Sequence, residues 1–199
     1  MAIKPILFNT EMVRAILDGR KTCTRRIIKA EKVDNVLNSP ARKSNPNIPD
    51  AQFIKCLVDM KYEPGDILYV RETWCKDPSR YMYRADYSNT ERFYKDGKEV
   101  SIKWKPSIHM PKEAARIWLK VTDVRVERLQ EITGQDVLKE GFNSHVHPQA
   151  SYFDGNQREM FEKLWNSTIK KSDIDRYGWD ASPWVWVIEF ERCEKPENL

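Results

Sequence analysis

The sequence predicts a single mixed α+β domain that is mainly β, built as a small β-barrel with helices packed on its flanks. Many segments are short and rich in β-branched and aromatic residues, and only a few stretches have the spacing of an amphipathic helix. A doubly wound parallel sheet needs regular alternation of strands and helices, and that alternation is missing. The 199 residues fit one domain, and a 40% apolar content is enough to bury a sizeable core.

The N-terminal elements are an apolar strand at residues 5–8 and a helix at residues 11–18. Asn9 or Thr10 is placed to cap the start of this helix, because short polar side chains accept hydrogen bonds from the first free N–H groups. Gly19 follows the last apolar position and is well placed to end the helix.

Residues 30–52 differ in composition from their surroundings. They are rich in Asn and Pro and contain few apolar residues. This composition predicts a long loop with little regular structure, which limited proteolysis should cut first. Order is expected to resume at residues 53–58.

The rest of the chain contains several short strands and two helices. Residues 64–66 predict a turn, and Asp96-Gly97 predicts the turn of a β-hairpin. The other expected strands are residues 22–28, 67–74, 81–84, 117–121 and 184–190, and the expected helices are residues 133–140 and 157–171.

Composition argues against a membrane protein and against a metal or cofactor site. The longest apolar runs are only a few residues, and no signal peptide is recognised. Four cysteines without a C-x-x-C pair predict free thiols and a cytoplasmic location. His145 and His147 are the only metal-like pair, and no third ligand lies beside them at the right spacing.

Charge is distributed unevenly along the chain, although the net charge is only +4. Residues 1–60 hold 11 basic and 6 acidic residues, whereas residues 120–199 hold 11 basic and 15 acidic ones. A basic N-terminal part suits a phosphate-bearing partner such as RNA or a nucleotide. The alternative is a solvated basic surface without a partner.

The polar segment after Gly19 is the main candidate for a working site, because a run of polar and cationic residues rarely builds a core. If Lys21 lies in the bend after Gly19, its amine meets the Thr24 hydroxyl and can accept that proton. The alternative is a basic strand edge that discourages pairing with other strands. As a strand, the segment puts Thr22, Thr24 and Arg26 on one face and Lys21, Cys23 and Arg25 on the other.

Two further places carry candidate residues. Glu140 is expected at the end of a helix, where the macrodipole disfavours a carboxylate, so a nearby cation would offset the cost. Arg71, Glu72 and Trp74 close a predicted strand, and Arg and Trp together can stack on a base. The alternatives are a solvated helix end and ordinary core packing.

Four segments of the chain form a pattern when they are taken together. They are Gly19-Arg20-Lys21-Thr22-x-Thr24-x-Arg26, Pro64-Gly65-Asp66-Ile67-Leu68, Leu129-x-x-Ile132-Thr133 with Glu140-Gly141-Phe142, and the closing strand after Pro183. As a set they resemble the ASCH family, whose domains have a PUA-like barrel. The Arg-Glu-Thr-Trp run and the closing Pro183-Trp184-Val185-Trp186 are similar to ASCH proteins of phages and prophages.

The resemblance implies a cleft and a link to RNA or modified nucleosides. Compact bacterial members of the family are amidohydrolases that deacetylate N(4)-acetylcytidine with a Lys, a Thr and a Glu. These map onto Lys21, Thr24 and Glu140. This chain is longer than those enzymes, with insertions expected at about residues 30–60, 75–110 and 143–175.

Three functions follow as hypotheses. The first is a module that binds a nucleic acid or a modified nucleoside. The second is an amidohydrolase that uses Lys21, Thr24 and Glu140, which should then face one solvent-accessible cleft. The third is a phage accessory protein that binds a host protein through its insertions. The ligand contacts expected beside the catalytic candidates are Thr22, Arg25, Arg26, Arg71, Glu72 and Trp74.

Overall fold

The structure is a computed structural model of the chain, and it describes residues 1–142 and 154–197 apart from residues 79 and 96. The chain divides into two compact units, each assembled from separate stretches. The first unit comprises Met1–Gly19, Gly65–Lys120 and Glu191–Leu199, and the second comprises Arg20–Pro64 and Val121–Phe190.

The first unit is built around β1 (Ile3–Leu7) and β3 (Ile67–Arg71), which pair in parallel. β3 also pairs antiparallel with the start of β8 (Trp118–Arg128), where Leu68 lies opposite Leu119. Both of these leucines are fully buried, as central strand residues should be.

Helix α1 (Thr10–Leu17) follows β1 and confirms the helix expected from the sequence. The Asn9 side chain accepts a hydrogen bond from Met12 N at 2.8 Å, which satisfies one of the free N–H groups at the helix start. Gly19 has φ +75°, a left-handed conformation that ends the helix and that other residues adopt only at a cost.

The remainder of the first unit consists of two short hairpins and three turns of 3₁₀ helix. The β4 (Trp74–Lys76) and β5 (Tyr81–Tyr83) strands form one hairpin. The second is formed by β6 (Phe93–Lys95) and β7 (Lys98–Val100), which confirms the expected hairpin, while Asp96 of its turn lies outside the described residues. The 3₁₀ turns are η1 (Arg84–Asp86), η2 (Ser107–His109) and η3 (Lys112–Ala114).

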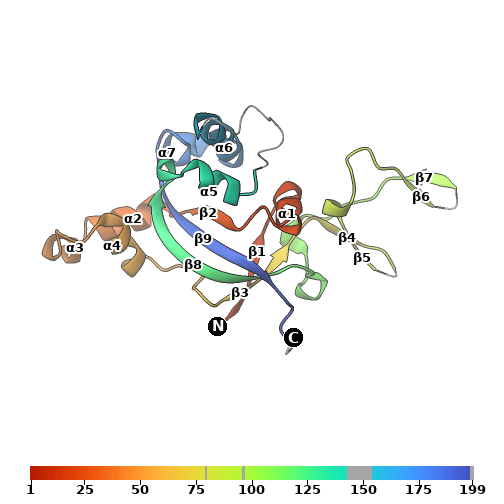
Figure 1. The fold of residues 1–199 in the computed structure, drawn as a ribbon, viewed down its shortest axis with the longest axis horizontal. Coiled ribbons are helices and arrows are strands. Elements are labelled where there is room, and N and C mark those ends of the chain that lie inside the picture. The colour runs from red at the N-terminus through yellow and green to blue at the C-terminus, as the bar shows by residue number, and fades with distance from the viewer. Residues whose placement is uncertain (79, 96, 143–153, 198–199) are drawn as a thin grey trace. The chain divides into compact units, whose positions relative to one another are not determined.

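The second unit combines β2 (Cys23–Ile27), most of β8 and most of β9 (Trp184–Cys193) with helices. β2 pairs antiparallel with β9. A turn of 3₁₀ helix, η4 (Leu129–Glu131), and helix α5 (Gly134–Lys139) follow β8, and α6 (Asp154–Thr168), η7 (Lys171–Asp173) and α7 (Ile174–Tyr177) precede β9 (Figure 1). The core that holds them together comprises Cys23, Leu129, Ile132, Val137, Phe161, Trp165, Trp179, Val185 and Val187.

Most of residues 30–52 lie in three helices, so the prediction of a long loop there is wrong. The helices are α2 (Ala30–Leu37), α3 (Pro40–Ser44) and α4 (Asp50–Leu57), which lie together in Figure 1. The polar residues that suggested a loop act as helix boundaries. The Ser39 hydroxyl accepts from Arg42 N, and Pro40 occupies the first turn, where its missing N–H costs nothing.

The strands form a mixed sheet in the order β1-β3-β8-β9-β2, which confirms the mixed α+β class. For the residues that the structure describes, this order is linear, so the sheet is open and the closed barrel expected from the sequence is not formed. Pro5 lies in β1 at one end of the order, and a residue without an N–H suits an edge strand.

Candidate functional site

The candidate site lies in the second unit, where the segment that enters β2 meets the end of α5. Lys21 and Glu140 form an isolated antiparallel bridge. Thr22 N donates to Lys139 O at 2.8 Å, and Thr22 O accepts from Phe190 N at 2.9 Å. The backbone of this segment is therefore held between the α5 terminus and β9.

Lys21 is the centre of the site. Its ammonium donates to Glu140 Oε2 at 2.6 Å, to Cys23 O at 2.7 Å and to Glu140 O at 2.9 Å. The Lys21 and Glu140 side chains are only 0% and 6% exposed. These three acceptors match in number the three N–H donors of an ammonium group.

Arg25 completes the charge balance on the same face of β2. Its Nη1 lies 3.2 Å from Glu140 Oε1, and its Nη2 lies 3.2 Å from Glu127 Oε2 and 3.7 Å from Asp136 Oδ2. Two cations therefore offset the unfavourable position of the Glu140 carboxylate at the end of α5. Arg25 Nε is buried without a hydrogen-bond partner among the described residues.

The network continues toward the surface through β8 and β9. Arg125 Nε lies 2.5 Å from Glu127 Oε1, and Arg125 Nη1 lies 2.8 Å from Glu189 Oε1. Lys139 Nζ lies 3.5 Å from the same Glu189 oxygen. A chain of alternating charges thus links the buried pair to half-exposed groups.

Burial dominates the proton affinities in this site. It lowers the pKa of the Lys21 ammonium, and the Glu140 carboxylate opposes that shift. Burial also raises the pKa of the Cys23 thiol to about 12, and the Glu140 charge adds to this effect. Cys23 is consequently an unreactive thiol near neutral pH.

The other predicted residues of this segment lie elsewhere around β2. Thr22 is exposed, and Arg26 is half-buried. Thr24 is 1% exposed and pairs with Ile188 in the register of β2 and β9. Strand alternation puts Thr24 on the face opposite Cys23 and Arg25. The structure therefore brings Lys21, Arg25 and Glu140 together, and it buries the Lys21–Glu140 pair rather than exposing it in an open cleft.

Arg71, Glu72 and Trp74 belong to the first unit, where all three make internal contacts. Arg71 donates to Met110 O and Ile108 O. Glu72 is 1% exposed and binds Arg116 through both oxygens, at 2.9 and 3.0 Å. The Trp74 ring packs against Tyr81, with the Lys105 ammonium 5.0 Å from its centroid.

Sequence reasoning missed Glu127 and Asp136, which bind Arg25. A signal for Glu127 exists in the run of residues 123–128, where charged and apolar residues alternate. That alternation puts Asp123, Arg125 and Glu127 on one strand face. Asp136 belongs to a capping box at the start of α5, where it also accepts from Thr133 N at 3.1 Å.

Metal ligands are not assembled at this site. Among the described residues, no three His, Cys, Asp or Glu side chains are grouped to hold a metal ion. The pair His145 and His147 lies outside the described residues. In the part of the chain that the structure describes, no helix has the length and apolar character needed to cross a membrane.

Comparison with known proteins does not establish the family of this chain. No family model and no curated protein matches the chain. The chain is similar to a solved structure described as an ASCH domain from Lactobacillus crispatus JV V101, with 10% identity and a TM-score of 0.39. The similarity covers 96% of this chain and 79% of that chain. A TM-score of this size does not establish a common fold, so membership of the ASCH family stays an expectation from the motif.

Proposed function

We propose that this protein binds a nucleic acid or a modified nucleoside through the segment Lys21–Arg26, as an ASCH-type domain with a PUA-like arrangement of strands. The supporting observation is the buried Lys21–Glu140 pair, which fixes this segment against α5. A preformed polar segment loses little conformational freedom when a ligand binds, and this favours affinity.

The residues of the segment differ in burial. Lys21 and Arg25 are buried and paired with carboxylates, so they shape the segment and do not bind phosphate directly. Thr22 is exposed and Arg26 is half-buried, and we expect these two side chains to contact the ligand. A threonine hydroxyl can donate and accept a hydrogen bond, and a guanidinium donates to carbonyl or phosphate oxygens.

Deacetylation of N(4)-acetylcytidine is a second candidate function. It is favoured by the 2.6 Å contact between Lys21 and Glu140 and by the burial that lowers the Lys21 pKa. In this mechanism Lys21 first loses its proton, and its neutral amine then takes the hydroxyl proton as the Thr24 oxygen attacks the acetyl carbonyl. Lys21 passes that proton to N4 of the cytosine, which leaves as cytidine, and Thr24 keeps the acetyl group as an ester. Water, oriented by Glu140, then releases acetate. The mechanism requires Thr24 to reach the amide from the opposite face of β2, so binding without turnover is the first proposal.

Binding is tested by titrating the purified protein with N(4)-acetylcytidine, with cytidine, and with a fluorescein-labelled single-stranded RNA of twelve nucleotides. Arg26→Gln should weaken binding by about 10-fold or more, because a charge-assisted hydrogen bond contributes roughly 1.5–3 kcal/mol. Arg192→Gln, at an exposed position in the first unit, is the matched control and should bind like the wild type. The proposal fails if none of the three probes binds or if both variants bind equally.

Turnover is tested separately by incubating the protein with N(4)-acetylcytidine and separating the products by chromatography. Cytidine and acetate formed by the wild type, and absent with Lys21→Ala, would favour the hydrolase. Binding with no product would favour the binding module.

A further inference from the structure

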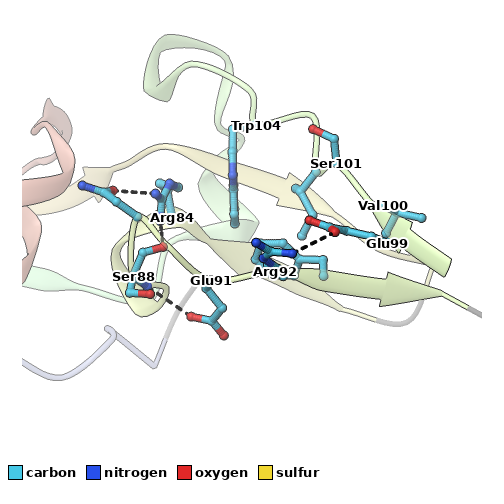
Figure 2. A pocket seen from close by; sticks show the side chains of 11 residues that line it. Arg84, Ser88, Glu91, Arg92, Glu99, Val100, Ser101 and Trp104 are labelled. Carbon is cyan, nitrogen blue, oxygen red and sulfur yellow. Dashed lines mark hydrogen bonds and ion pairs between the residues drawn. The ribbon is translucent and has the colours of Figure 1, made fainter. Parts of the chain in front are cut away.

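A pocket in the first unit is lined by residues of two stretches, 84–93 and 99–104. Its volume is about 590 Å³, which falls within the usual range for small-ligand sites. Figure 2 shows the side chains that line it, with Trp104 between Arg84 and the Arg92–Glu99 pair in that view. The lining residues that matter to the argument are Arg84, Ser88, Arg92, Glu99, Ser101 and Trp104.

Backbone hydrogen bonds hold both ends of the segment 84–104 against the same short stretch. At its start, Arg84 N donates to Thr73 O at 2.9 Å. Just after its end, Lys105 and Trp74 exchange two hydrogen bonds, at 2.7 and 3.2 Å. The residues at the two ends of the segment are therefore fixed side by side.

One wall of the pocket is an aromatic cluster. The Trp104 ring centroid lies 5.7 Å from that of Tyr87 and 6.3 Å from that of Phe93. Tyr87 and Phe93 are themselves 5.1 Å apart, in an edge-to-face arrangement. Trp104 is only half-buried, so its ring is held by neighbours while part of it lines the pocket.

Arg84 is fixed beside this ring. Its guanidinium carbon lies 5.8 Å from the Trp104 centroid. Its Nη1 donates to Tyr87 O at 2.6 Å, and its Nη2 donates to Asn89 Oδ1 at 2.6 Å. A guanidinium and an indole held together in this way offer two planar surfaces for stacking.

The rim of the pocket carries both signs of charge. Arg92 Nη1 lies 3.4 Å from Glu99 Oε2, and these side chains are 68% and 55% exposed. An exposed pair of this kind contributes little to stability and can open to a ligand. Together with the Ser88 and Ser101 hydroxyls, the rim provides donors and acceptors, which suits the polar edge of a heterocycle better than a simple anion.

The surrounding segment has an excess of basic residues. Residues 76–105 contain eight Lys and Arg against five Asp and Glu. Excess positive charge beside stacking rings is the combination that binds single strands, because the bases stack while the phosphates stay near the cations.

We propose that this pocket binds one base of a single-stranded nucleic acid, stacked on Trp104 beside the Arg84 guanidinium, with its polar edge at the Arg92–Glu99 rim. This site is separate from the segment Lys21–Arg26 and does not depend on the function proposed there. Residues 84–104 would thus be a binding element of the first unit.

The test measures fluorescence anisotropy of a fluorescein-labelled oligo(rU) of twelve nucleotides, with oligo(dT) of the same length as a second probe. Trp104→Ala should weaken binding by about 5-fold or more, the effect of losing one stacked base. Trp104→Phe, which keeps an aromatic face, should recover most of the affinity.

Trp104 also packs on Tyr87 and Phe93, so a second variant leaves that cluster intact. Ser101→Leu adds bulk at the exposed pocket rim and should weaken binding to a similar extent. Ser44→Leu, an exposed serine on α3 in the second unit, is the matched control and should bind like the wild type.

The outcomes separate the two proposed sites. Loss of binding with Trp104→Ala and Ser101→Leu, but not with Ser44→Leu, supports the pocket. Wild-type affinity in Trp104→Ala or Ser101→Leu overturns it, as does a wild-type protein that binds neither oligonucleotide. Failure of N(4)-acetylcytidine to bind, by contrast, affects only the segment Lys21–Arg26.

Discussion

Burial makes the Lys21 ammonium and the Glu140 carboxylate depend on each other. Removing each ion from water costs several kcal/mol, and the opposite charge at 2.6 Å offsets much of that cost. Glu140 also binds Arg25, whose other carboxylate partners are Glu127 and Asp136. The Lys21–Glu140 pair therefore adds little net stability to the fold. Removing either partner is nevertheless strongly destabilising, because it leaves a buried charge without its counterion.

Glu140→Gln should lower the free energy of unfolding by about 3–5 kcal/mol, since it leaves Lys21 and Arg25 without their shared carboxylate. Urea denaturation followed by circular dichroism measures the change. Glu31→Gln, which removes an exposed partner of Arg176, is the control and should leave the midpoint unchanged. Equal midpoints for both variants would show that the Lys21–Glu140 pair is not buried in solution.

Cys23 and Cys56 should differ sharply in thiol reactivity. Burial raises the Cys23 pKa from 9.0 to about 12, whereas Cys56 is exposed. Only the thiolate reacts, so iodoacetamide at mildly alkaline pH should label Cys56 and spare Cys23 in the folded protein. Mass spectrometry of the digested protein measures the fraction of Cys23 and of Cys56 that is labelled. Labelling of Cys23 at the rate of Cys56 would contradict its burial.

The raised Cys23 pKa also affects stability at high pH. The folded chain keeps the thiol proton over the range from pH 9.0 to about 12, while the unfolded chain loses it. The contribution of Cys23 is therefore fully present below this range and is lost as the pH rises through it. Cys23→Ala should flatten the alkaline decline in the unfolding midpoint.

The contact between Lys21 and Glu140 could be anticipated because a carboxylate at a helix C-terminus needs a cation. The partners of Arg25 could not. Glu127 lies 102 positions away along the chain, and only the placement of β8 and α5 in three dimensions brings Glu127 and Asp136 to Arg25. Spacing along one segment carries no information about such pairings.

Local signals predicted most secondary-structure elements well. They failed where the same polar residues are favoured both in loops and at the ends of helices. Asn9 and Gly19 mark the two ends of α1 because each satisfies a local backbone requirement. In residues 30–52 the same kinds of residue separate three helices that are each short. Composition alone cannot distinguish a loop from a series of capped helices, since Ser, Asn and Pro are favoured in both.

Gly19→Ala should lower the free energy of unfolding by about 1–2 kcal/mol, because an alanine at φ +75° is strained although no atom lies within 4 Å of the added carbon. Gly19→Asn should cost less, since asparagine tolerates the left-handed conformation. Thermal unfolding followed by circular dichroism ranks the variants. An alanine variant as stable as the wild type would mean that α1 does not end in this conformation.

At the scale of the whole molecule, neither unit is continuous in sequence, so no linker or shift in composition marks a boundary between them. The long strands β8 and β9 each contribute residues to both units. The distribution of charge, by contrast, can be determined from the sequence alone, because the N-terminal part is basic and the C-terminal part is acidic.

The charge distribution predicts which lysines contact a bound nucleic acid. Lys21 and Arg25 are neutralised by carboxylates, so the exposed lysines of residues 1–60 should provide the phosphate contacts. They are Lys29, Lys32, Lys43 and Lys55. Changing all four to Gln should weaken binding of single-stranded RNA and make it less sensitive to salt.

The measurement is the dependence of the RNA association constant on salt concentration, plotted on logarithmic axes. Each lysine that contacts a phosphate contributes about 0.7 to the slope for a single strand, because its binding releases a condensed counterion. The matched control changes four exposed lysines of the acidic C-terminal part, Lys163, Lys170, Lys171 and Lys195, to Gln. If nucleic acid follows the basic N-terminal part, the first variant has the shallower slope and the control keeps that of the wild type. The opposite order would assign the phosphate contacts to the C-terminal part, and a wild-type slope of zero would exclude phosphate recognition altogether.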